Sequence, residues 1–182
     1  MKNLIVGILF LVVFYGCVTV KRTKEVTPVV EQTAEPVVNF ADQSTWVLGY
    51  VTLGQLTREP HSAWYFKGFD DYLPNTDALN KLLEINKDGL TIKIVMGTWC
   101  PDSRREVPRF MRILDVWQFP VSMVTFIGVD NAKLSPVGEY TKLDIQRVPT
   151  FIIYNNNIEA GRIIENPATS LEQDMVNILT MK

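Results

Sequence analysis

The sequence predicts an α/β fold in which a central mixed β-sheet carries helices on both faces. Three apolar runs, residues 90–98, 121–130 and 147–154, are typical of buried strands. Segments with helical spacing lie between and after them, and a fourth strand at residues 158–165 completes a hairpin. The order strand, helix, strand, helix, strand, strand, helix therefore predicts parallel and antiparallel pairs within one sheet.

Composition narrows the classes of function. A chain of 182 residues with 47% hydrophobic residues is expected to form one domain with a proper core. The net charge of −2, with no basic block outside the N-terminus, gives no support for nucleic-acid binding. One histidine, His61, and two cysteines, Cys17 and Cys100, cannot supply the four ligands of a usual structural zinc site. We therefore expect neither a metal nor another cofactor.

The N-terminus has the layout of a secretory signal. "MKNLIVGILFLVVFYGC" begins with a lysine, continues as an apolar run and ends in Gly16-Cys17. Residues 1–16 resemble a bacterial lipoprotein signal, although Phe14 and Tyr15 replace the usual leucine and small residue. The resemblance implies that Cys17 is lipidated and that the domain is anchored to a bacterial membrane, facing the periplasm or the exterior.

An uncleaved membrane helix is the alternative interpretation of this segment. The apolar run from Leu4 to about Val20 is just long enough for a span, and Lys21, Arg22 and Lys24 on its far side favour a cytoplasmic domain. Residues 17–39 are rich in Thr, Val, Glu and Pro without periodicity, which predicts an extended tether.

Residues 40–89 are expected to form a helical N-terminal elaboration of the domain at 40–182. Asp42 and Ser44 are candidate helix starts before "TWVLGYVTLGQL", and the aromatic residues of "HSAWYFKGFDDYL" are expected in the core. His61, beside Pro60, is expected to be a solvated loop residue. A clearer helix follows, capped by Thr76 and ended by Asp88-Gly89.

Residues 90–182 are expected to form the core of the domain. Pro101 begins a helix after the first strand, and a short helical piece spans about 137–143. A turn at Asn155–Asn157 joins the last two strands, and a helix follows Ser170.

The stretch "IVMGTWCPDSRREVPRF" places one cysteine where a strand passes into a helix. This arrangement resembles the thioredoxin superfamily: "WCPDS" stands in the place of W-C-x-x-C, and Pro108 matches the proline of the active-site helix. "VPT", Val148 to Thr150, matches the tripeptide that contains the family's cis-proline. The resemblance covers roughly residues 93–182 and implies that Cys100, Ser103 and Pro149 are catalytic. It further implies that Trp99, Pro101 and Val148 bind substrate.

Two departures from the family pattern bear on activity. Ser103 stands in place of the second cysteine, and Ile94 stands in place of the buried acidic residue six positions before Cys100. Because a serine cannot attack a mixed disulfide, Cys100 can react once but cannot release the product alone. The sequence thus predicts monothiol exchange with protein or low-molecular-weight thiols and disulfides.

The position of Cys100 favours a reactive sulfur. With Pro101 as the first helical residue, Cys100 becomes the N-cap, where free N–H groups and the helix dipole favour the thiolate. Ser103 is expected to donate a hydrogen bond to the sulfur, and Arg104 to attract it, whereas Asp102 would act in the opposite direction.

Two other functions fit the same residues. A non-catalytic module would hold an extended peptide or protein partner along the edge at Val148, with Cys100 as a small packing residue. A peroxidase-type site would use Thr98 with Arg104 and Arg147, although Trp99 directly before the cysteine favours the thioredoxin-like interpretation.

Overall fold

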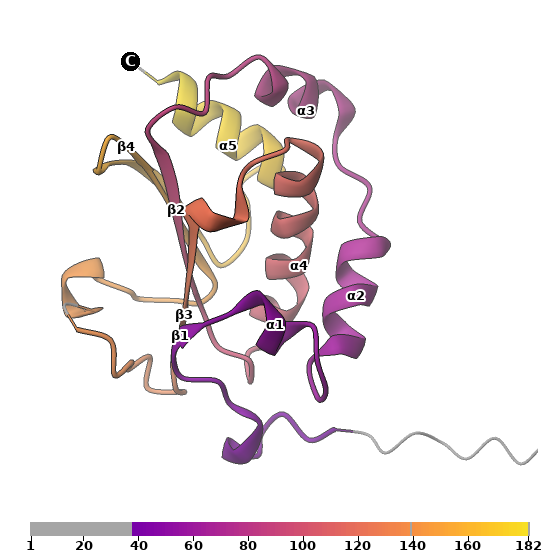
Figure 1. Cartoon of the computed structure of the whole chain (residues 1–182), viewed down its shortest axis with the longest axis vertical. Coiled ribbons are helices and arrows are strands. Elements are labelled where there is room, and N and C mark those ends of the chain that lie inside the picture. Colours follow the sequence, from indigo (N-terminus) through magenta and orange to yellow (C-terminus); the bar gives the residue numbers. More distant parts are fainter. Residues whose placement is uncertain (1–37, 139, 182) are drawn as a thin grey trace, which may run out of the picture. The chain divides into compact units, whose positions relative to one another are not determined.

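The computed structural model describes residues 38–138 and 140–181, which form an α/β domain (Figure 1). The predicted signal at 1–16, Cys17 and the tether up to residue 37 lie outside the described residues. The strands are β1 (Gly49–Val51), β2 (Leu90–Met96), β3 (Val124–Gly128), β4 (Thr150–Asn155) and β5 (Ile158–Ile164). The helices are η1 (Gln43–Thr45), α1 (Leu53–Leu56), α2 (Ser62–Asp70), α3 (Thr76–Leu83), α4 (Pro101–Val116), η2 (Val121–Met123), η3 (Tyr140–Leu143) and α5 (Leu171–Thr180), where η denotes a 3-10 helix.

The five strands form one mixed sheet in the order β1-β3-β2-β4-β5. Strands β2 and β3 run parallel, with Ile94 opposite Phe126, whereas β4 is antiparallel to β2 and to β5. The predicted hairpin around Asn155–Asn157 is confirmed by the pairing of β4 with β5. The sheet and its connections confirm the predicted α/β, thioredoxin-like fold.

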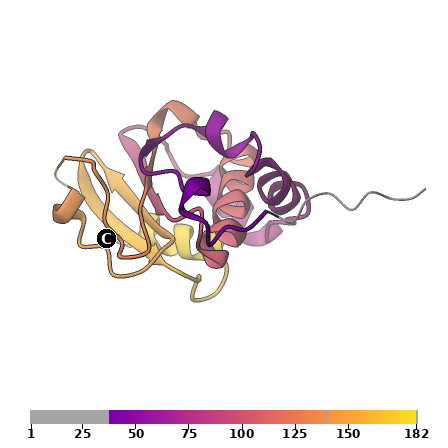
Figure 2. The same ribbon diagram turned by 90° about the horizontal axis from the view of Figure 1, so that it is seen from below.

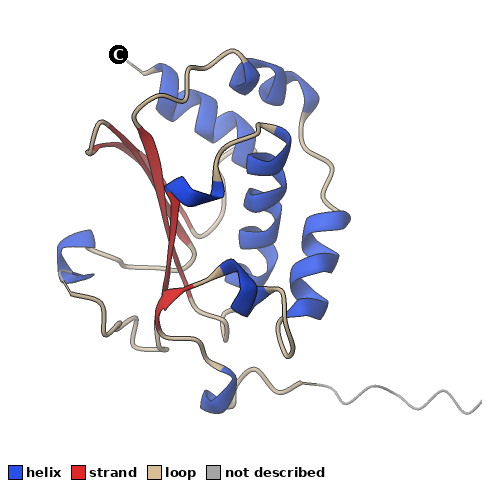
Figure 3. Cartoon of the chain, in the orientation of Figure 1, coloured by secondary structure: helices blue, strands red, loops and turns tan. Residues whose placement is uncertain are grey.

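The two faces of the sheet are covered differently (Figure 3). The α-helices lie on one face and enclose the larger core, in which Phe110 of α4 stacks on Phe151 of β4 with ring centroids 4.3 Å apart. The other face carries η3 and its flanking loops, which enclose a smaller cluster containing Val95, Tyr140 and Cys100. Helices thus occur on both faces, and the short helical piece expected at about 137–143 is the 3-10 helix η3.

Pro108 lies inside α4 and is buried there. It faces Gly68 of α2, where an added Cβ would stand only 2.5 Å from the proline ring. The absence of a side chain at Gly68 therefore lets α2 pack closely against α4 at this point.

The N-terminal segment 40–89, expected to be a helical elaboration, contains the strand β1 besides its helices. Asp42 does cap a helix, since its side chain accepts a hydrogen bond from Ser44 N–H, but that helix is the three-residue η1. The chain then forms β1, which pairs antiparallel with β3 at the edge of the sheet. Pairing with β3 satisfies the backbone groups of this segment, and Gly49 enters the strand with a φ of 81°, which favours glycine.

Helix α3 is shorter than expected and is capped by a different residue. The Asn75 side chain accepts a hydrogen bond from Ala78 N–H, so Asn75 is the N-cap and Thr76 is the first helical residue. The helix ends at Leu83, and Asp88-Gly89 instead forms the turn before β2, with Gly89 at a φ of 74°. The strand expected at 121–130 likewise begins later, because residues 121–123 form η2.

His61 is buried rather than solvated, with 3% of its surface exposed. Its ring stacks on Phe40 at 5.8 Å and meets the edge of Trp64 at 5.9 Å. Among the other aromatic residues of α2, Phe66 is exposed, whereas Phe69 packs against the larger core. His61 is thus buried despite its polar ring, because Phe40, which is distant in the sequence, packs against it.

None of the helices within the described residues is long and apolar enough to cross a membrane.

Candidate functional site

Cys100 is the N-cap of α4, as predicted. Strand β2 ends at Met96, and a turn closed by the 3.0 Å hydrogen bond from Cys100 N–H to Gly97 O leads into the helix. Pro101 then occupies the first helical turn and Cys100 has an extended backbone, with φ −78° and ψ 123°. No side-chain capping bond occupies the helix N-terminus. The sulfur therefore stands where the helix dipole interacts favourably with negative charge.

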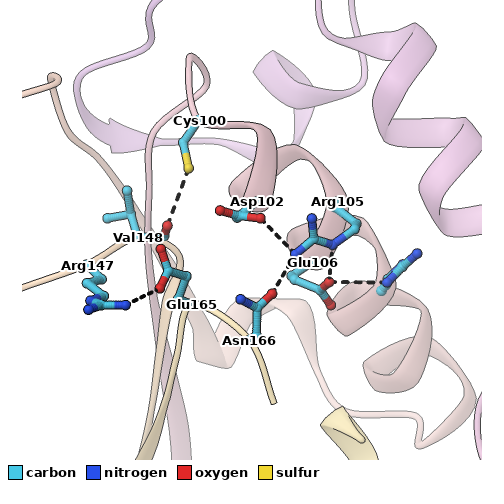
Figure 4. Close-up of polar contacts among 9 residues, drawn as sticks. Cys100, Asp102, Arg105, Glu106, Arg147, Val148, Glu165 and Asn166 are labelled. Atoms are coloured by element: carbon cyan, nitrogen blue, oxygen red, sulfur yellow. Dashed lines mark hydrogen bonds and ion pairs between the residues drawn. The ribbon is translucent and has the colours of Figure 1, made fainter. Parts of the chain in front are cut away.

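The thiol faces the loop that precedes β4 (Figure 4). Cys100 Sγ donates a hydrogen bond to Val148 O at 3.3 Å, across 48 residues of sequence. The Val148–Pro149 peptide bond is cis, as the resemblance to thioredoxins implies. The structure thus brings the cysteine and the proline tripeptide together.

Little of Cys100 is exposed. Its exposed fraction is 6%, and it packs with Val95, Ile127, Val129 and Tyr140 on the face of the sheet that carries η3. The site therefore combines a thiol at a polar helix terminus with mostly apolar surroundings.

Ser103 does not make the predicted contact. It is fully buried, and its hydroxyl accepts a hydrogen bond from Gly97 N–H at 3.2 Å, beneath the first turn of α4. The contacts of the described residues include no hydrogen bond between Ser103 and the sulfur. Because Ser103 lies one turn into α4, its hydroxyl is directed toward the end of β2, where it satisfies the N–H group of Gly97.

Trp99 and Pro101 flank Cys100 in the sequence and are both more exposed than the cysteine. Trp99 is half-buried and its Nε1–H donates to Val129 O at 2.9 Å, which fixes the indole across the turn. The indole occupies the space above Gly97, where an added Cβ would stand 2.5 Å from it. Pro101 is exposed.

The charged residues predicted to influence the sulfur differ in their partners. Asp102 pairs with Arg105 at 2.7 Å, which offsets its charge near the helix N-terminus, and Arg147 pairs with Glu165 at 2.7 Å (Figure 4). Arg104 instead donates from Nη1 to Thr98 O at 3.4 Å. Burial lowers the pKa of Arg104, and negative charge on Cys100 acts in the opposite direction.

The sequence did not predict that the N-terminal segment 38–48 reaches this site (Figure 2). Thr98 joins the segment through its Oγ1, which accepts from Val47 N–H at 3.2 Å and donates to Thr45 O at 3.3 Å. The Trp46 ring lies 6.1 Å from the Trp99 ring, and the Arg104 guanidinium lies 4.2 Å from the centre of the Phe40 ring. These contacts join residues 51 to 64 positions apart, and no local pattern indicates them.

A groove of about 470 Å³ lies between this segment and the cysteine turn. It is lined by Val38, Asn39, Phe40, Ala41, Trp46, Trp99, Arg104 and Asn131. We call it the Arg104 groove. Three of its eight lining residues are aromatic, and Arg104 is the charged residue that lines it.

The described residues contain no group of three or more His, Cys, Asp or Glu side chains that could hold a metal ion.

No family model matches the chain, and no curated protein matches it. Among solved structures, a protein of unknown function from Pseudomonas aeruginosa is 13% identical, with a TM-score of 0.44 over 65% of this chain and 78% of that one. An HIV epitope scaffold is 13% identical, with a TM-score of 0.40 over 64% and 71% of the two chains. Thioredoxin from Trypanosoma brucei brucei is 22% identical, with a TM-score of 0.35 over 60% and 89%. At these similarities the case for a function rests on the geometry of the site.

Proposed function

We propose that the chain is a thioredoxin-like protein that performs monothiol thiol–disulfide exchange through Cys100. The observation that supports this most directly is the position of the sulfur, at the N-terminus of α4 and 3.3 Å from the carbonyl oxygen beside Pro149. A thiolate at a helix N-terminus is the nucleophile that such exchange requires.

The exchange has two steps. The Cys100 thiolate attacks one sulfur of a disulfide R–S–S–R, which forms Cys100–S–S–R and releases R–S⁻. An outside thiol then attacks this mixed disulfide, leaves with the R–S group as a new disulfide and returns Cys100 as a thiol. Ser103 takes no part in release, since its hydroxyl cannot act as a resolving thiol and is held against Gly97.

The second candidate is a non-catalytic binding module, and the observation that favours it is the 6% exposure of Cys100. In that function the sulfur is a packing atom between β2, β3 and the loop before β4. An extended peptide or protein partner would then bind along the edge at Val148.

Exchange with a small neutral disulfide separates the two candidates. The test uses the full chain with Cys17→Ser, in which Cys100 is the remaining cysteine, and bis(2-hydroxyethyl) disulfide as the probe. Exchange predicts that the folded protein gains the mass of one half-disulfide, that an added thiol reverses this gain, and that Cys100→Ser abolishes it. If the folded protein gains no mass while the urea-unfolded protein does, the packing role is correct and the exchange function is not.

The proposal includes a location for the domain. We infer that Cys17 carries a lipid and that the domain faces the periplasm or the exterior of a bacterial cell, since residues 1–17 have the layout of a lipoprotein signal. Growth with radioactive palmitate should label the wild-type chain and leave Cys17→Ala unlabelled. Label retained by Cys17→Ala would eliminate the lipid anchor.

A further inference from the structure

The Arg104 groove contains a cation that has no anionic partner among the described residues. Helix α4 carries four arginines, of which Arg105, Arg109 and Arg112 each pair with a carboxylate at 2.6 to 3.2 Å. Arg104 makes one hydrogen bond, from Nη1 to the Thr98 carbonyl, and stacks on Phe40. A guanidinium has five N–H donors, so most of its donors remain available to a ligand.

The surroundings make this unpaired charge unfavourable. Arg104 is half-buried in the groove, where its guanidinium stacks on Phe40, and burial lowers its pKa. Removing a guanidinium from water without a counter-charge raises its free energy, and a carboxylate that accepts two of its N–H groups restores that energy. The charge of the groove is thus complementary to an anion.

The groove is also close to the reacting sulfur. Arg104 lies four residues beyond Cys100, and its N–H closes the first helical turn on Cys100 O at 3.1 Å. Residues four apart on a helix have Cβ atoms about 6 Å from each other. Trp99, which precedes the cysteine, forms a wall of the groove. A small disulfide that reaches Cys100 would therefore have a carboxylate a few bonds from its sulfur within reach of Arg104.

We propose that the Arg104 groove binds the carboxylate of the substrate, so that Cys100 exchanges preferentially with disulfides that carry a carboxylate a few bonds from sulfur. This inference rests on the exchange function proposed above and names its substrate class. Arg104 holds the anion, and Phe40, Trp46 and Trp99 contact the apolar atoms between the carboxylate and the sulfur. The electron balance is that of ordinary exchange, with one disulfide broken and one formed.

Three disulfides of similar size and different charge test the inference. They are 3,3′-dithiodipropionate, which is anionic, bis(2-hydroxyethyl) disulfide, which is neutral, and cystamine, which is cationic. With the full Cys17→Ser chain at low salt, we expect the anionic probe to form the Cys100 adduct about tenfold faster than the neutral one, and cystamine to be slowest. Because the groove is partly open to solvent, added salt should reduce this preference.

The ratio of anionic to neutral rates isolates the carboxylate from the reactivity of the thiol. Arg104→Gln should bring the ratio close to one, whereas Arg104→Lys should keep it above one because the charge remains. Arg112→Gln is the matched control, since Arg112 pairs with Asp115 near the far end of α4, and it should leave the ratio unchanged.

The outcomes separate this inference from the function on which it rests. Equal rates for the three probes, or a ratio that survives Arg104→Gln, would overturn the carboxylate site while leaving exchange intact. A folded wild-type protein that reacts with none of the probes would overturn the exchange function itself.

Discussion

At the scale of single residues, the serine at position 103 limits the exchange that we propose for Cys100. Ser103 lies one helical turn from the sulfur, and its side chain is directed toward Gly97 at the end of β2. In the proposed exchange, the reaction would therefore stop at a mixed disulfide that only an outside thiol can resolve. This limit was predictable from the sequence, because it depends on the identity of one residue and not on its contacts.

Ser103→Cys should convert the monothiol site into one that releases its own adduct. A second thiol one turn away attacks at a high effective concentration, so the mixed disulfide should disappear at least tenfold faster than in the parent chain. Intact mass measured over time after removal of the probe checks this, with the loss of two hydrogens marking the internal disulfide. Ser122→Cys is the control, because Ser122 is exposed in η2, before β3 begins. Equal adduct lifetimes in the two variants would contradict the prediction.

His61 gives the domain a pH-dependent stability. Burial lowers the pKa of His61 and the charge of Arg104 adds to the shift, while Glu59 opposes it. Since the folded pKa is below the unfolded value of 6.5, the unfolded chain binds more protons as the pH falls through and below 6.5. The free energy of unfolding contributed by His61 is therefore complete above pH 6.5 and decreases in more acidic solution.

His61→Phe should flatten this dependence. Phenylalanine keeps a ring against Phe40 and Trp64 and removes the titrating group. Urea unfolding between pH 7 and pH 5 should show a smaller loss of unfolding free energy for the variant than for the parent. Carboxylates contribute to both curves alike, so parallel curves would show that His61 does not couple folding to protons.

At the scale of elements, β1 and the segment before it depend on a close backbone contact. Gly128 at the end of β3 faces Val47 O, and an added Cβ would overlap that oxygen and approach Val51 within 3.0 Å. Residues 40–51 can lie on the edge of the sheet only because this position lacks a side chain. The need for glycine at position 128 arises from the pairing of β1 with β3, which are distant in the sequence.

Gly128→Ala should lower the free energy of unfolding by about 1–3 kcal/mol, as overpacking typically does. It should also loosen β1 and the contacts of Val47 with Thr98. Gly138→Ala is the matched control, since nothing stands within 4 Å of its added Cβ, and it should have little effect on stability. Chemical denaturation of both variants gives the comparison, and equal stabilities would mean that the strand can shift without loss.

At the scale of the whole domain, a buried carboxylate joins the link between α2 and α3 to the C-terminal helix. Glu172 in the first turn of α5 is fully buried, and its Oε1 accepts from Tyr72 Oη–H at 2.8 Å and from Asn75 N–H at 3.2 Å. Its Oε2 is buried without a hydrogen-bond partner among the described residues. The link between α2 and α3 is thus attached to α5 by the two hydrogen bonds that Glu172 Oε1 accepts.

Tyr72→Phe should therefore be costly. Removal of one donor from a buried carboxylate destabilises a domain by about 1–3 kcal/mol. Tyr50→Phe is the control, because Tyr50 is 68% exposed and its hydroxyl should contribute little. A loss no greater for Tyr72→Phe than for Tyr50→Phe in thermal or urea unfolding would show that water replaces the phenol.

The elements that could be predicted from the sequence are those whose signals are local. The apolar runs of β2 and β4 indicated strands because both faces are buried, and Cys100-Pro101 indicated a helix start because proline suits the first turn. Strand β1, the burial of His61 and the isolation of Arg104 could not be predicted. Strand β1 depends on its pairing with β3, and the burial of His61 depends on its contact with Phe40. The environment of Arg104 likewise depends on Phe40, which is distant in the sequence.

The Arg104 groove has a practical consequence for where the domain can be truncated. Five of its lining residues, Val38 to Ala41 and Trp46, precede the first strand. A recombinant fragment started at Gly49 would retain every strand and the cysteine turn, yet would lack one whole side of the groove. We expect such a fragment to lose the discrimination between anionic and neutral disulfides that the proposed carboxylate site would provide.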